Sequence, residues 1–205
     1  MSTIIKSEID KKRNKIKDIL NMNVNEDRAF SYVMLEYIFG VDFIDQDDMI
    51  TDGSNDGGID FIYYDDEDAK VVLCQSKYTG SLQYNDLVAE FDKMYSTLQN
   101  FRDGNTGHYN NKLKRVLQNA LDRLPDENSD NVEFNLFTAA PIDIIAATKK
   151  IDNTSHSFSV DMVNIYGPEE IEKSIKNVLE SLNTVPCEKV KIDRAKNYLE
   201  YESSD

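Results

Sequence analysis

The stretch from Thr51 to Tyr78 constrains the fold of this chain more than any other part, because a glycine-rich turn leads there into two segments of β-strand character. Apolar patterning predicts one strand at about residues 59–64 and a second at about residues 70–77. The acidic run at residues 65–68 predicts the tip of a hairpin between them. We therefore expect an antiparallel hairpin at the centre of the fold.

Polar residues gather at one end of this expected hairpin. Asp60 opens the first strand, and Gln75, Ser76 and Lys77 close the second. Since alternate side chains of a strand share a face, Gln75 and Lys77 are expected on one face and Ser76 on the other. A carboxylate that binds a hard divalent cation, beside a lysine that orients or helps deprotonate a metal-bound water, suits phosphodiester hydrolysis. The alternative is a solvated hairpin with ordinary polar ends.

The sequence GGID, which ends at Asp60, and the sequence QSKY, which begins at Gln75, resemble the D-QxK variant of the PD-(D/E)XK, or restriction-endonuclease-like, nuclease superfamily. Within this superfamily, the two motifs look most like those of the N-terminal domain of abortive phage infection proteins. The resemblance implies that Asp60 is the motif aspartate, Gln75 occupies the (D/E) position and Lys77 is the motif lysine. It implies Mg²⁺ or Mn²⁺ as cofactor, held by Asp60, Gln75 and a backbone carbonyl near Ser76. A neutral Gln in place of an acid departs from the parent pattern and predicts weak metal affinity without substrate.

The resemblance also points to residues on the neighbouring helices. Many nucleases of this superfamily carry an acidic residue on the helix before the first strand, and Glu36 fits that slot as a catalytic residue and metal ligand. Glu26 competes with it, and an ordinary helix carboxylate is the alternative for Glu36. On the helix after the motif lysine, Gln83 and Tyr84 are the candidates for substrate contacts.

A calcium-binding loop is a rival interpretation of the same turn. Asp52, Ser54 and Asp56 match early positions of an EF-hand loop. The final position would be Tyr63, where the loop requires a bidentate Glu, and the residues beyond it alternate like a strand. We therefore interpret the glycines as backbone freedom for a tight turn that delivers Asp60 to the site.

Periodicity along the rest of the chain predicts an α/β fold. The expected helices cover about residues 3–20, 26–39, 82–98, 110–124, 142–150 and 167–182. Further strands are expected at about residues 49–51, 132–139 and 158–166, and an acidic connector at residues 42–48. Strands that alternate with helices in the second half predict parallel pairing through crossover connections.

With the resemblance, this order implies a restriction-endonuclease-like core at residues 25–182. Its central mixed sheet would have about five strands flanked by helices, with a helix pair added between the third and fourth strands. The nuclease-like domain is expected at residues 1–183, and residues 184–205 are expected to be a tail or the start of a following region. Because proteins of the abortive-infection type are much longer, the resemblance implies that the chain is an N-terminal domain or fragment.

The net charge of −15, from 23 basic and 38 acidic residues, is awkward for a protein that binds nucleic acid. Phosphate contacts would then come from a local basic patch or from another region or partner. The most positive segment lies in the first expected helix, where a solvated face is the leading interpretation and phosphate contact the alternative. Its basic residues are Lys11, Lys12, Arg13, Lys15 and Lys17.

Asp60, Gln75 and Lys77, together with the resemblance, predict a metal-dependent endonuclease that cuts DNA, with RNA as the less favoured substrate. The resemblance implies a role in phage defence. The alternative function is a nuclease-fold module that binds nucleic acid or a protein partner without cutting. A third expectation is a defence or toxin-like assembly protein whose acidic surface meets a basic partner. A homodimer is also among the expected partners.

Apolar runs too short to span a bilayer, and an N-terminus without a secretory core, predict a cytoplasmic protein with no membrane partner. Cys74 and Cys187 are the only cysteines, and neither a disulfide framework nor a zinc site is expected. Cys74 is interpreted as a small core residue.

Overall fold

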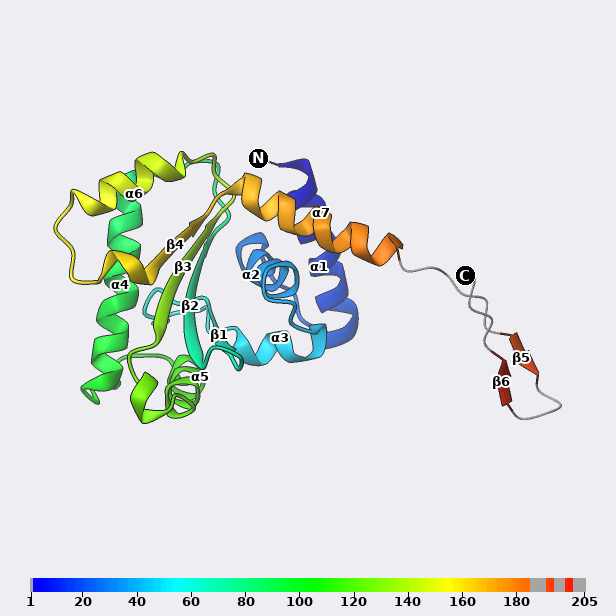
Figure 1. Cartoon of the computed structure of the whole chain (residues 1–205), viewed down its shortest axis with the longest axis horizontal. Coiled ribbons are helices and arrows are strands. Elements are labelled where there is room, and N and C mark those ends of the chain that lie inside the picture. The colour runs from blue at the N-terminus through cyan, green and yellow to red at the C-terminus, as the bar shows by residue number, and fades with distance from the viewer. Residues whose placement is uncertain (1, 185–190, 194–197, 201–205) are drawn as a thin grey trace.

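One four-stranded mixed sheet, with helices on both faces, organises the chain (Figure 1). The structure is a computed structural model that describes residues 2–184, 191–193 and 198–200. The strands of this sheet, in spatial order, are β1 (Phe61–Asp65), β2 (Lys70–Lys77), β3 (Val132–Thr138) and β4 (Val163–Tyr166). β1 pairs antiparallel with β2, whereas β2 with β3 and β3 with β4 pair in parallel.

Six of the described helices cover the two faces of the sheet (Figure 1). On one face lie α1 (Thr3–Leu20), α2 (Glu26–Tyr37) and α7 (Pro168–Thr184). On the other lie α4 (Tyr84–Arg102), α5 (Asn111–Asp122) and α6 (Ile144–Asp152). The short helix α3 (Phe43–Met49) packs against α2 and β1. Two further strands, β5 (Lys191–Asp193) and β6 (Tyr198–Glu200), pair only with each other.

Each face of the sheet has its own hydrophobic core. Along β2, Leu73 packs in the core beneath α4 and α5, and Val72 packs in the core beneath α1 and α2. This alternation follows from the strand period of two residues, and each such buried side chain contributes roughly 1.5–3 kcal/mol of transfer free energy. Cys74 is fully buried on the α2 side, as expected of a small core residue. Cys187 lies outside the described residues.

The sheet of the described residues has four strands where about five were expected. The prediction of a strand at residues 49–51 is wrong, because Met49 ends α3 and Ile50 makes only an isolated bridge to Phe61. The chain curls immediately afterwards, where the N–H groups of Thr51 and Asp52 both donate to the carbonyl of Asp60, at 2.7 and 3.0 Å. Bends and turns at residues 53–58 follow directly, so no strand continues there.

Two other segments differ from expectation. The acidic connector expected at residues 42–48 is mostly helix α3, which buries Gln46. The strand expected at residues 158–166 is shorter, because a 3-10 turn at Val160–Met162 precedes β4 and Phe158 packs against Phe91 instead. Another 3-10 turn covers Asp126–Asn128. The helix pair between β2 and β3 is present as α4 and α5.

The expected tail at residues 184–205 lies largely outside the described residues, which include only Thr184 and the two short strands β5 and β6 from that range. Among the helices of the described ranges, none combines the length and apolar character of a bilayer span.

Candidate active site

The start of β1 and the end of β2 lie at the same edge of the sheet as the carboxyl ends of β3 and β4. This follows from the pairing, since β1 runs antiparallel to β2 and the other strands run parallel to it. The register pairs Phe61 with Cys74, and the Asp60 N–H donates to the Cys74 carbonyl at 2.8 Å. Asp60 is therefore fixed beside the last residues of β2.

The Asp60 carboxylate is buried and hydrogen-bonded to the neighbouring strand. Its Oδ2 accepts from Gln75 Nε2 at 2.9 Å and from the Ser76 N–H at 2.7 Å, and its exposed fraction is 8%. Burial, helped by the charges of Asp52 and Asp56, raises the pKa of Asp60 to about 7, although the hydrogen bond from the Ser76 N–H opposes the shift. The structure thus brings together Asp60, Gln75 and Ser76.

Two more carboxylates lie beside Asp60. One oxygen from each of Asp52, Asp56 and Asp60 falls within 4.8 Å of the others. Burial also raises the pKa of Asp52. Asp56 accepts from the N–H groups of Gly53 at 3.2 Å and Gly58 at 2.8 Å, so it also closes the turn that carries the group. Three neighbouring carboxylates repel one another unless protons or a cation offset their charge.

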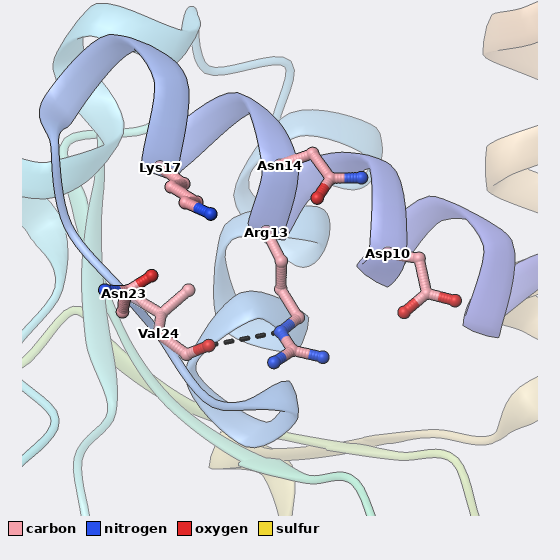
Figure 2. Close-up of a pocket in the computed structure, with 6 residues that line it drawn as sticks. All are labelled: Asp10, Arg13, Asn14, Lys17, Asn23 and Val24. Atoms are coloured by element: carbon pink, nitrogen blue, oxygen red, sulfur yellow. Dashed lines mark hydrogen bonds between the residues drawn. The ribbon is translucent and has the colours of Figure 1, made fainter.

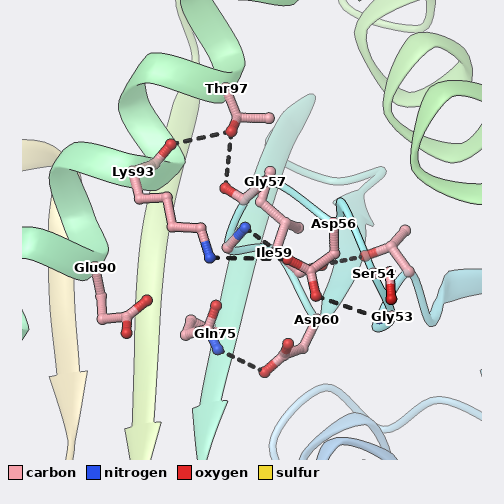
Figure 3. A network of polar contacts seen from close by, with 12 residues as sticks. Gly53, Ser54, Asp56, Gly57, Ile59, Asp60, Gln75, Glu90, Lys93 and Thr97 are labelled. Atoms are coloured by element: carbon pink, nitrogen blue, oxygen red, sulfur yellow. Dashed lines mark hydrogen bonds and ion pairs between the residues drawn. The ribbon is translucent and has the colours of Figure 1, made fainter. Parts of the chain in front are cut away.

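Helix α4 holds this turn from the other side (Figure 3). Gly57 has φ +66°, and its carbonyl accepts from Thr97 Oγ1 at 2.7 Å. A Cβ at Gly57 would lie 2.4 Å from that hydroxyl oxygen, so the close approach requires glycine. One turn earlier on α4, Lys93 Nζ lies 4.0 Å from Asp56 Oδ1.

Lys77 also meets α4. Its Nζ lies 2.6 Å from Glu90 Oε1. Gln75 and Lys77 share the α4 face of β2 with Leu73, whereas Ser76 faces α2 and its Oγ lies 2.6 Å from Ser31 Oγ. The predicted division of the β2 side chains between the two faces is therefore what the structure has.

Two oxygens of this region are buried without a hydrogen-bond partner among the described residues. They are Gln75 Oε1 and Glu90 Oε2. Buried acceptors are rarely left unsatisfied, so such atoms point to a missing water or ion. Carboxylate and amide oxygens are the ligands that Mg²⁺ and Mn²⁺ prefer. The residues present around Asp60 therefore fit a hard divalent cation.

The other predicted site residues either have different partners or are exposed. Glu36 forms an ion pair with Lys12 of α1, and Lys12 also donates to Gln46 Oε1 at 3.2 Å. Among the described residues, the acidic group around Asp60 does not include Glu36. Gln83 and Tyr84 are exposed at the start of α4, where Gln83 makes no side-chain cap hydrogen bond.

The basic run on α1 lies on the sheet face opposite α4. Lys12 is buried in the ion pair with Glu36, and burial lowers its pKa. Arg13 donates to the Val24 carbonyl and lines a hollow of about 340 Å³ with Lys17, among other residues (Figure 2). Asp10 also lines it, so the hollow carries mixed charge.

Sequence reasoning missed Glu90. A usable signal exists, because Glu90 lies three residues after Leu87 and four before Met94, both of which are buried core residues. A carboxylate on the apolar side of a helix calls for a partner or a function. Asp52 and Asp56 were considered only as calcium-loop ligands.

Comparison of the chain with protein-family models finds no matching family, and comparison with curated proteins finds no match either.

Proposed function

We propose that this protein is a metal-dependent nuclease with a restriction-endonuclease-like core, which hydrolyses phosphodiester bonds of DNA, with RNA as the alternative substrate. The observation that carries the proposal is the buried Asp60 carboxylate, bonded to Gln75 and the Ser76 N–H at the edge of the sheet where Lys77 ends β2. A role in phage defence is part of the proposal and rests on the resemblance of GGID and QSKY alone.

The residues that would hold Mg²⁺ are Asp60, the Gln75 amide oxygen and a backbone carbonyl near Ser76, with Asp52 and Asp56 close by. When bound, such an ion lowers the pKa of a water and offsets charge on the scissile phosphate. The raised pKa of Asp60 means that the bare carboxyl is partly protonated near neutral pH. Metal binding and proton release are therefore expected to be coupled.

Lys77 is the residue proposed to act on the attacking water and the phosphate. Its ammonium has three donors and no acceptor, so it can orient a water or stabilise negative charge that develops in the transition state. Glu90 holds this ammonium at 2.6 Å and keeps it at the edge of the site. Lys93, more than half exposed beside Asp56, offers a second positive charge for an incoming phosphate group.

The test is Mg²⁺- or Mn²⁺-dependent cleavage of supercoiled plasmid and of single-stranded RNA. We expect Asp60→Asn and Lys77→Met each to lose on the order of 100-fold or more in cleavage rate. Lys176→Met, which removes an exposed lysine paired with Glu172 on α7, serves as the matched control. Undiminished cleavage by both site variants would remove the assignment.

A second candidate function is a binding module with the same fold. Two features favour it. The neutral Gln75 binds a cation less strongly than a carboxylate would, and the net charge of −15 weakens the attraction for nucleic acid. Such a module would bind the plasmid or leave it alone, but would never nick it at any Mg²⁺ or Mn²⁺ concentration.

A further inference from the structure

Glu90 has a carboxylate that its ion pair only half satisfies. One oxygen contacts Lys77 Nζ at 2.6 Å, and the other is buried with no hydrogen-bond partner among the described residues. Gln75, whose exposed fraction is 6%, likewise donates to Asp60 through Nε2 and leaves Oε1 unpartnered. A buried acceptor without a hydrogen bond lowers the stability of the fold, and a charged acceptor lowers it more.

The two unpartnered oxygens belong to side chains of the two elements that pack together here, Gln75 on β2 and Glu90 on α4. Gln75 and Lys77 project from the α4 face of β2 two residues apart, and Lys77 touches Glu90 directly. In Figure 3 the Glu90 carboxylate extends from α4 toward the strand that carries Gln75, with Asp60 beyond the amide. Gln75 is thus bonded directly to Asp60, and Glu90 is joined through Lys77 to the same end of β2, although the close group of Asp52, Asp56 and Asp60 does not itself include Glu90.

The charge of this region favours a cation over a water molecule. The carboxylates of Asp52, Asp56 and Asp60 form one group with Lys93 beside Asp56, and the Glu90 carboxylate is paired with Lys77. Lys93 is more than half exposed, so its offset is screened by solvent. A divalent cation would satisfy both orphan oxygens and reduce the excess negative charge.

We infer that Glu90 is a further ligand of the divalent cation, supplying the negative charge that Gln75 lacks while it holds Lys77 through its other oxygen. This inference rests on the proposed function. It assigns to α4 a part of the metal site that the D-QxK motif does not contain. Glu90 then links the cation and the lysine through one carboxylate.

The test measures Mn²⁺ binding by electron paramagnetic resonance of the free ion, without substrate, for the whole chain. We expect Glu90→Gln to weaken Mn²⁺ affinity tenfold or more. Asp86→Asn, which removes one exposed carboxylate from the first turn of the same helix, should change it less than twofold. Asp60→Asn should also lose affinity.

A second comparison separates a ligand from a partner that only neutralises Lys77. In a Lys77→Met background, Glu90→Gln should still weaken Mn²⁺ binding tenfold or more. In that double variant neither member of the pair is left as an unpaired charge, so the comparison holds even if Glu90→Gln alone folds poorly.

Affinity that is unchanged by Glu90→Gln in the Lys77→Met background overturns this inference and leaves the proposed function standing. Failure of the wild-type chain to bind Mn²⁺ at all counts against the proposed function itself, and the role of Glu90 falls with it.

Discussion

Asp60 is expected to make the metal-free protein less stable as the pH rises. Burial, with the nearby charges of Asp52 and Asp56, raises its pKa from 3.8 to about 7 in the folded state. The folded chain therefore keeps this proton at pH values where the unfolded chain releases it. Stability falls between about pH 4 and pH 7, and the loss is complete above pH 7.

The magnitude follows from the two pKa values. At about 1.4 kcal/mol for each tenfold difference in proton affinity, the full cost of the ionised Asp60 carboxylate is about 4 kcal/mol. Asp60→Asn keeps the size of the side chain and an oxygen that can accept from the Ser76 N–H, but removes the charge. It should therefore be more stable than the wild-type chain, by an amount that grows by about 3 kcal/mol between pH 5 and pH 8.

Urea unfolding in EDTA, at both pH values, measures this difference, because the titration of groups that do not interact with Asp60 cancels between the two chains. Asp86→Asn, at an exposed acid, is the control and should show no such growth. Added Mg²⁺ should then stabilise the wild-type chain at pH 8 and leave Asp60→Asn nearly unaffected. A difference between Asp60→Asn and wild type that stays constant from pH 5 to pH 8 would refute the reasoning.

Two further substitutions test the surroundings of the site. Gly57→Ala should lower the free energy of unfolding by about 3 kcal/mol, since the added Cβ would meet Thr97 and the backbone there is left-handed. Gly80→Ala, where the space is open, should change this free energy little, and urea titration compares the two variants. Glu36→Gln should cost about 3 kcal/mol by leaving Lys12 as a buried unpaired charge, with unaltered Mn²⁺ affinity; a tenfold loss of that affinity would instead make Glu36 a ligand.

Local signals predicted the hairpin well. The strand expected at residues 70–77 has those bounds in β2, and the helix expected from residue 26 begins there as α2. The contact between Asp60 and Gln75 was accessible for the same reason, because the register of a hairpin is set by residues close in sequence. Their catalytic roles stay predictions.

Contacts between distant helices could not be predicted in the same way. An amphipathic pattern says which face of α2 is apolar, but not that Lys12 of α1 will pair with Glu36. Residues 42–48 are mostly helical although Gln46 is the buried residue of α3, so no apolar stripe in the sequence predicts this helix. Glu90 reaches Lys77 only because α4 packs on the sheet.

The contacts that α4 makes have a mechanical consequence. Glu90, Lys93 and Thr97 follow one another at intervals of three and four residues, so they form one row along a single helix. One helix, α4, thereby positions both Lys77 at the end of β2 and the turn that carries Asp56. One residue inserted between positions 90 and 97 would rotate the helix after the insertion by about 100° relative to the helix before it, so α4 could no longer contact Lys77 and the Asp56 turn at once. An insertion beyond Arg102 would leave the three side chains aligned.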